Sequence, residues 1–238
     1  MLAANEEIAN LMRDAFNPAI PMHMGDRRKL KAFIFDFDGV VVDTEKYHYL
    51  SWCQAAAHVG YDLGWEEYLP LKSTGNTEIT QYLCDHSGKD VSEELFQIMR
   101  QTKLTSFDEL VKDLSEKDVL PGIRDFLTWL NEQGVKTAVA SSSNTSSGLA
   151  NRFDLTKHFG VVIDGNRKLP RKPAPDTFLL AAKMLGVEPQ DCIVFEDSLA
   201  GIGAAVNAGM PVVAVGGIRS EQAVLHIQDF RDIRNYFG

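Results

Sequence analysis

Apolar residues follow two patterns along this chain: short continuous runs, and positions repeated at helical spacing. The first run, AFIF over residues 32–35, is typical of a strand buried on both faces of a sheet. From residue 120 onward, strand-like runs alternate with helical segments, which favours parallel βαβ units in a doubly wound α/β sheet. Helices are expected over residues 123–133, 145–152, 175–186 and 199–208, and strands over 135–140, 161–163, 192–195 and 211–215.

The segment between the first strand and residue 116 follows the helical pattern alone. Residues 45–59 place Tyr47 and Leu50 on one side, and the later helical pieces are broken at glycines and at Pro70. An insertion after the first strand emerges at the carboxyl end of the sheet, where open α/β sheets bind ligands, so it is suited to act as a lid. The expected parts are an N-terminal extension over residues 1–26, a catalytic α/β core over 27–43 and 116–238, and a helical cap over 44–115.

The N-terminal extension has an amphipathic pattern of its own. Residues 3–16 place Ile8, Leu11 and Met12 on one helical face. The segment lacks a basic start and an uninterrupted apolar stretch, so we expect no secretory signal there. We expect a loosely docked or partly disordered arm, and the pattern leaves its role open.

The acidic composition narrows the classes of function. The 238 residues carry a formal net charge of −9, which repels phosphate backbones and argues against nucleic-acid binding. No apolar run approaches the length needed to span a membrane. The three cysteines form no CxxC pattern, so we expect neither a disulfide framework nor a zinc site, and a reducing, cytoplasmic setting. The oligomeric state stays open, with a monomer slightly favoured.

Two aspartates, Asp36 and Asp38, directly follow the buried first strand in the stretch FIFDFDGVVVDT. Like charges at this spacing repel, and burying either one without a partner is costly. A cation is the simplest way to offset that cost.

Polar residues also follow two later strands of the expected sheet. Ser141 begins a run of three serines, Glu196 and Asp197 end the stretch CIVFED, and Lys172 lies between them in RKPAPDTF. The carboxyl ends of parallel strands meet at one edge, so we expect these groups to converge with the two aspartates. Carboxylates together with a phosphate suit Mg²⁺, and phosphoryl transfer depends mainly on positioning and charge stabilisation. One aspartate can serve as the nucleophile and a second, two residues on, as the general acid and base.

Four segments resemble, in order, the motifs of the haloacid dehalogenase superfamily: DFDGVVVDT, ASSS, KPAPDTF and FEDSLAGI. The resemblance covers residues 32–216. Within the superfamily the chain is similar to the branch that contains β-phosphoglucomutase and related sugar-phosphate phosphatases, which have a helical cap after the first motif. The resemblance implies a Rossmann-like core with an inserted cap, Mg²⁺ as cofactor and a small phosphorylated metabolite as substrate.

The resemblance also implies roles for the carboxylates. Asp36 would be the nucleophile, forming an aspartyl-phosphate, and a metal ligand. Asp38 would be the general acid and base, with its backbone carbonyl on the metal. Asp197 would bind Mg²⁺, and Glu196 would be a further ligand, directly or through water.

The phosphate-binding groups follow from the same resemblance. Ser141 would bind the phosphate and Lys172 would bridge it to Asp36. The backbone N–H groups of Phe37 and Ser142 would add contacts. In the cap, His48 and Lys72 would face the substrate.

Several of these residues could instead have a purely structural role. Ser143 or Asn144 could cap the helix after the serines, and Asp197 could cap the helix near Ser198. His48 and Trp52 could be packed helix residues, and Lys72 could be an exposed surface lysine. Gly201 and Gly203 lie inside an expected helix, where glycine is costly, and we expect close packing against the sheet there.

Two departures from the β-phosphoglucomutase pattern bear on the reaction. Asn144 stands where those enzymes usually carry a lysine, and no arginine lies between Asp43 and Met99, where they have a cap arginine for a second phosphate. Both departures favour hydrolysis of a small phosphomonoester, a sugar or polyol phosphate, over a hexose-phosphate mutase. The DGN stretch at residues 164–166 resembles mutase-like members and keeps that alternative open. A non-catalytic sensor of phosphorylated metabolites and a haloacid dehalogenase are less favoured alternatives.

Overall fold

The computed structural model describes residues 30–72, 74–231 and 233. The expected N-terminal helix over residues 3–16 lies outside this part of the chain. The chain divides into two compact units. The core unit consists of the residues up to Val42 and those from Val119 onward, and the helical unit is Asp43–Asp118.

The core unit is built on a six-stranded sheet with the order β3-β2-β1-β4-β5-β6, in which every neighbouring pair is parallel. β1 lies in the middle, and Phe35 at its end is level with Val139 of β2 and Phe195 of β4. The loops that follow these three strands therefore leave the sheet at the same edge. The strands are β1 Ala32–Phe35, β2 Lys136–Ala140, β3 Val161–Ile163, β4 Cys192–Glu196, β5 Val212–Val215 and β6 Leu225–Ile227.

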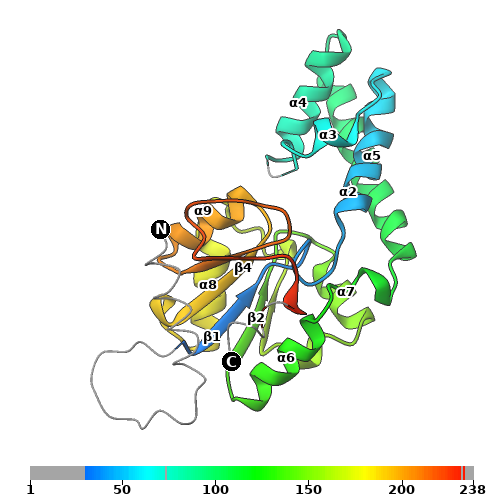
Figure 1. Ribbon diagram of the computed structural model, residues 1–238. Helices are drawn as coiled ribbons and strands as arrows, with labels where there is room; N and C mark the ends of the chain where they lie inside the picture. Colours follow the sequence, from blue (N-terminus) through cyan, green and yellow to red (C-terminus); the bar gives the residue numbers. More distant parts are fainter. Residues whose placement is uncertain (1–29, 73, 232, 234–238) are drawn as a thin grey trace. The chain divides into compact units, whose positions relative to one another are not determined.

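Successive side chains of β1 point to opposite faces of the sheet, so the apolar core of this unit lies in two layers, one on each face. Ala32 and Ile34 belong to an apolar cluster that includes residues of α8 and α9. Phe33 and Phe35 face the other way, where both contact Phe126 of α6 edge-on. Figure 1 shows α8 and α9 on one side of the sheet and α6 on the other. The helices of this unit are α6 Ile123–Glu132, α7 Ser146–Arg152, α8 Asp176–Leu185 and α9 Leu199–Asn207.

The doubly wound α/β fold predicted from the sequence is confirmed, and each expected helix and strand of the core is present within a residue or two of its predicted bounds. One strand was missed. β6 is only three residues long and has His226 at its centre, so it lacks the apolar run that marks the other strands.

The helical unit has a separate apolar core formed by residues such as Trp52, Leu83 and Met99, and within it α2 packs against α5. Its two ends meet, because the Asp43 N–H donates a hydrogen bond to the Asp118 carbonyl at 2.7 Å. Its α-helices are α2 Glu45–Ala56, α3 Trp65–Tyr68, α4 Asn76–Ser87 and α5 Glu93–Leu110.

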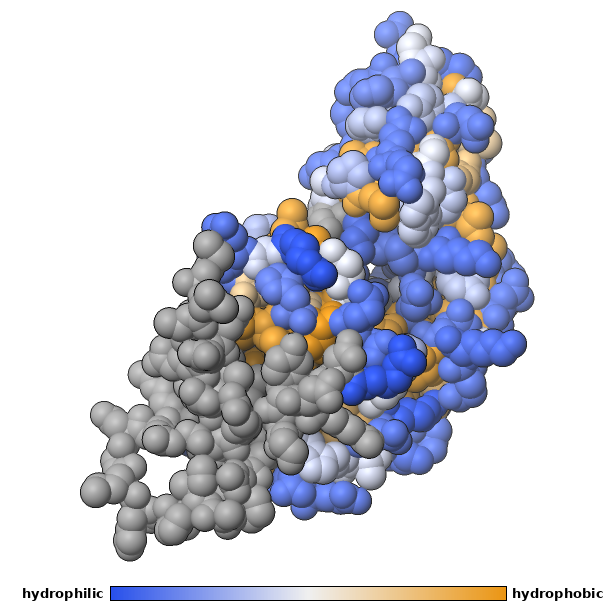
Figure 2. Space-filling model, in the orientation of Figure 1, coloured by the Kyte–Doolittle hydropathy of each residue, from blue (hydrophilic) through white to orange (hydrophobic). Residues whose placement is uncertain are grey.

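The surface of the described residues is largely polar on the face that Figure 2 shows. On the face drawn in Figure 2, hydrophilic side chains predominate and apolar ones emerge in small groups. Within the described part of the chain, no helix combines the length and apolar character needed to cross a bilayer.

Candidate active site

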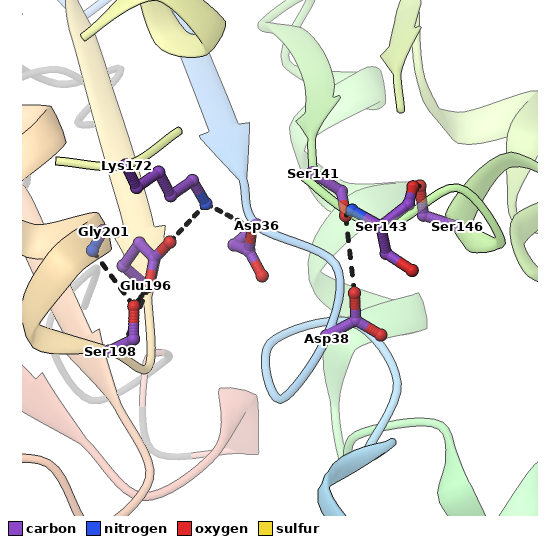
Figure 3. Close-up of polar contacts among 9 residues, drawn as sticks. All are labelled: Asp36, Asp38, Ser141, Ser143, Ser146, Lys172, Glu196, Ser198 and Gly201. Carbon is purple, nitrogen blue, oxygen red and sulfur yellow. Dashed lines mark hydrogen bonds and ion pairs between the residues drawn. The ribbon is translucent and has the colours of Figure 1, made fainter. Parts of the chain in front are cut away.

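Asp36 lies at the carboxyl edge of the sheet, one residue beyond β1. Its N–H donates to the Phe195 carbonyl at 2.9 Å, which continues the pairing between β1 and β4 and fixes the backbone. The residue is only 7% exposed. Its Oδ1 accepts a hydrogen bond from the Lys172 ammonium, which also donates to Oε1 of Glu196. Figure 3 shows Lys172 between these two carboxylates.

Burial and neighbouring charges determine the protonation of this group. Burial is the largest influence and raises the pKa of Asp36 well above its usual range. The Lys172 ammonium opposes this effect and lowers the pKa of Asp36, whereas nearby carboxylates raise it. Burial lowers the pKa of Lys172, but the charges of Asp36 and Glu196 outweigh burial and leave that pKa above its usual value. Lys172 is therefore a permanent cation, and it favours the ionised form of Asp36.

Both carboxylate oxygens of Glu196 accept hydrogen bonds, and the residue is 1% exposed. While Oε1 accepts from Lys172, Oε2 accepts from the Ser198 N–H at 3.0 Å and the Ser198 hydroxyl at 2.9 Å. Ser198 is the N-cap of α9, where its Oγ accepts from the Gly201 N–H at 3.0 Å. Ser198, and not Asp197, therefore caps this helix, and the cap also fixes Glu196.

Asp38 and Ser141 meet across the gap between the β1 and β2 loops. The Ser141 hydroxyl donates to Asp38 Oδ2 over a long 3.4 Å, and its oxygen accepts from the Ser143 N–H at 3.0 Å. Ser141 is buried whereas Ser142 is exposed. The N-cap residue of α7 is Thr145 and not Ser143 or Asn144, and its own side chain makes no capping hydrogen bond. The Ser143 hydroxyl nevertheless accepts from the Thr145 N–H at 3.4 Å. Residues 141–144 are referred to below as the serine loop.

Asp197 adjoins the loop after β1 through Gly39. Gly39 has φ +78°, in the left-handed region that favours glycine. A Cβ at this position would overlap the Asp197 carboxylate. The turn between Asp38 and Val40 therefore depends on glycine for both its conformation and its space, and it brings the first and fourth sequence motifs into contact.

The donor set of this site fits a hard divalent cation in its chemistry. The negative charges of Glu196, Asp38 and Asp197 all act on Asp36, and Lys172 supplies one positive charge against these four carboxylates. Carboxylate oxygens are the ligands that Mg²⁺ prefers. No group of three or more acidic, histidine or cysteine side chains within the described residues has the spacing of a metal site, so only the charge and the ligand type of the site point to a divalent cation.

The residues predicted in the cap belong to the helical unit. The His48 ring stacks on Phe107 with centroids 4.0 Å apart, and its Nδ1 lies 3.2 Å from Nζ of Lys103. Lys72 forms an ion pair with Glu45 at 2.7 Å, so its charge is already partnered. Trp52 is a core residue of this unit.

Lys103 is a charged residue that the sequence analysis did not single out. It is 5% exposed and its ammonium lies 4.8 Å from the Phe107 ring centroid. Its position within α5 carries no local signal, and only its contact with His48 reveals it.

The carboxylate of Glu196 occupies the space that a side chain at Gly201 would need. A Cβ at Gly201 would overlap the Glu196 carboxylate, so Gly201→Ala must displace a buried group that holds Lys172. We expect a loss of about 1–3 kcal/mol in the free energy of unfolding, together with reduced activity. Chemical denaturation and steady-state kinetics would measure both.

The matched control for this change is Gly148→Ala in α7, where nothing lies within 4 Å of the added Cβ. This variant should be neutral, or more stable by up to about 1 kcal/mol. Equal stability of the two variants would show that Glu196 does not depend on the space at Gly201.

Comparisons with known proteins agree with this geometry. The family model described as haloacid dehalogenase-like hydrolase matches residues 30–209. A β-phosphoglucomutase from Bacillus subtilis (strain 168) is 35% identical, with 79% of this chain and 84% of the relative covered. A fructose-1-phosphate phosphatase from Escherichia coli (strain K12) is 30% identical, with 76% of this chain and 94% of the relative covered.

A solved structure shows the same fold over most of the chain. The crystal structure of a β-phosphoglucomutase from Clostridium difficile is 31% identical, with a TM-score of 0.76 and coverage of 87% of this chain and 97% of the other. The resemblance stated from the four motifs is therefore confirmed. The chain belongs to the haloacid dehalogenase-like hydrolase family of enzymes.

Proposed function

We propose that this protein is a Mg²⁺-dependent phosphatase that hydrolyses a small phosphomonoester, a sugar or polyol phosphate, through an aspartyl-phosphate. The buried pair of Asp36 and Lys172 at the carboxyl edge of the sheet carries the proposal. The names of the relatives support it, since one is a sugar-phosphate phosphatase and another a phosphosugar mutase.

The residues of the chain divide the proposed reaction between them. Asp36 attacks phosphorus, and the ammonium of Lys172 keeps it ionised and stabilises the phosphoryl oxygens. Asp38 donates a proton to the leaving oxygen and then takes one from the attacking water. The Ser141 hydroxyl, which contacts Asp38, would also hold a phosphoryl oxygen. The backbone N–H groups of Phe37 and Ser142 complete the proposed phosphate site.

The carboxylates would differ in how they bind the metal. Bound Mg²⁺ would offset the charge of the carboxylates and of the phosphate. Asp36, the backbone carbonyl of Asp38, and Asp197 would hold it. Both oxygens of Glu196 already accept hydrogen bonds, which favours its role through water over direct ligation.

The helical unit has a place in this proposal as the cap. In that role His48 and Lys72 would reach the substrate, Lys72 after leaving Glu45. Lid closure would exclude water during the first transfer.

Phosphate release from a panel of sugar and polyol monophosphates, measured with and without Mg²⁺, tests the proposal. We expect turnover of at least one member with Mg²⁺ and its loss after chelation, restored when Mg²⁺ is added back. Equal turnover in the presence of a chelator would contradict the role of the metal. Activity on a halo-acid with no activity on any phosphate ester would overturn the reaction class.

A hexose-phosphate mutase is the second candidate, favoured by β-phosphoglucomutases among the similar proteins and by Asp164-Gly165-Asn166. Incubation with β-glucose 1-phosphate distinguishes the two reactions. Free phosphate supports the phosphatase, whereas isomerised sugar without free phosphate supports the mutase.

A further inference from the structure

An ion pair between Glu45 and Lys72 joins the first turn of α2 to the loop after α3. The Lys72 Nζ lies 2.7 Å from Oε2 of Glu45, and the two side chains are 21% and 20% exposed, respectively. Both charges are therefore largely withdrawn from water, and they are screened less than an exposed pair. Moving Lys72 away leaves the Glu45 carboxylate without this cation, which is costly for a half-buried charge.

The length of the chain keeps Glu45 close to the turn that carries Asp38. Val42 forms a β-bridge with Asp38, and the Val42 carbonyl accepts from the Gly39 N–H at 2.8 Å. Glu45 follows Val42 by three residues, so the Cα atoms of these two residues lie within about 11 Å of each other by chain length alone. Glu45 is thus an acidic side chain at the start of the helical unit, a short distance along the chain from the proposed general acid and base.

The helical unit carries most of the negative charge of the protein. Residues 43–118 contain fifteen aspartates and glutamates against seven lysines and arginines. Their net charge is −8, compared with −9 for the whole chain. In the core unit, the serine loop has no basic side chain, and Lys172 is held between two carboxylates. The helical unit therefore offers a negative potential to a substrate, which disfavours a second anionic group.

A substrate tail with hydroxyl groups can satisfy Glu45, whereas an anionic tail cannot. The O–H of an alcohol donates to a carboxylate, and its oxygen accepts from an ammonium. A carboxylate or a dianionic phosphate has acceptor oxygens alone, and it would add a like charge beside Glu45. Repulsion of this kind is a common way in which a site rejects the wrong partner.

We propose that Glu45 is a specificity-determining residue, which selects substrates that are uncharged beyond the transferred phosphoryl group. When Lys72 turns from Glu45 to the substrate, the Glu45 carboxylate accepts hydrogen bonds from hydroxyls of the substrate tail and repels a tail with a second negative charge. This inference rests on the proposed function. It names the residue that sets the charge of the accepted substrate.

The test compares fructose 1-phosphate, which is uncharged beyond its phosphate, with fructose 1,6-bisphosphate. Wild-type kcat/KM should favour the monophosphate. Glu45→Gln keeps a hydrogen-bond acceptor but removes the charge. We expect it to raise kcat/KM for the bisphosphate by roughly tenfold and to change that for the monophosphate by less than about threefold. Glu45→Asp should retain the wild-type preference, because it keeps the charge. An unchanged ratio in Glu45→Gln would overturn the inference.

Glu94→Gln is the matched control. Glu94 is also an acidic residue in the first turn of a helix of this unit, α5, and it is exposed. The change therefore removes the same charge and a similar interaction with the helix dipole on a different helix. The ratio of the two kcat/KM values should stay at its wild-type value. An equal shift in Glu94→Gln would show that the net charge of the helical unit, and not Glu45, sets the preference.

A binding measurement keeps the inference separate from the proposed function. Calorimetry on the Asp36→Asn protein, with Mg²⁺ present, should show tighter binding of the monophosphate than of the bisphosphate, and adding Glu45→Gln should reduce the difference. If no phosphate ester is turned over, the proposed function fails, but this comparison still decides the inference. A ratio of affinities that Glu45→Gln leaves unchanged, or no binding of either sugar, would overturn it.

Discussion

Asp36→Asn is expected to lower kcat for phosphate release by at least about 10⁴-fold, because the amide oxygen cannot replace the carboxylate as the nucleophile. The fold should persist. Asparagine has the same shape, and its amide oxygen can still accept the hydrogen bond from Lys172. Steady-state kinetics with the best substrate of the panel, together with a thermal unfolding curve, would measure both effects.

The control for this variant is Asp90→Asn, an exposed aspartate of the helical unit, which should retain full activity. Mass spectrometry of wild-type protein quenched during turnover should also find phosphate on the peptide that contains Asp36. An Asp36→Asn protein within tenfold of wild-type activity would exclude this residue as the nucleophile.

Lys172→Met should cause the largest loss of stability in the core unit. The ammonium is buried between two carboxylates and lies 4.8 Å from the Phe178 ring centroid. Removing one partner from a buried group of charges typically costs about 3–5 kcal/mol. Activity should fall by roughly 10²–10³-fold, because a preorganised cation at the phosphoryl oxygens is lost.

The pH dependence of this loss has a defined sign. Lys172 lowers the pKa of Asp36 against the effect of burial, so its removal raises that pKa further. A carboxyl whose pKa is higher in the folded state destabilises the fold at pH values above its unfolded pKa, and the cost disappears on protonation. Urea denaturation should therefore show the gap between variant and wild type narrowing as the pH falls from 7 toward about 4.

Two comparisons check that interpretation of Lys172→Met. Lys31→Met removes an exposed lysine that is paired with Asp191 and should have little effect at any pH. Adding Glu196→Gln to Lys172→Met should recover part of the lost stability without restoring activity. A stability gap that does not change with pH would show that packing, and not charge, accounts for the loss.

The sequence could predict the arrangement of the motif residues because parallel strands bring their ends to one edge. Asp36, Ser141 and Glu196 each follow or end a buried apolar run, and β1 lies directly between β2 and β4. That simple geometry is enough to bring the carboxylates and the hydroxyl together, and Lys172 joins them from the loop before α8. It requires no knowledge of how individual side chains pack.

Features that depend on how side chains pack could not be predicted from the sequence. Gly201 was expected to pack against the sheet, but the space it leaves is filled by the Glu196 side chain at the end of β4. Lys103 sits on an ordinary amphipathic helix, and its burial beside His48 becomes visible only in the packing of α2 against α5. Neither contact has a local pattern, because the partners lie far apart in the sequence or on different elements.

The meeting of Asp43 and Asp118 has an evolutionary consequence. A segment that enters and leaves at one point, where backbone hydrogen bonds such as the 2.7 Å contact from Asp43 to Asp118 join its two ends, can be replaced by another segment with the same spacing of its ends, without shifting a strand. Recombination at this junction could therefore give descendants of one ancestral hydrolase new inserts while their sheet stayed unchanged.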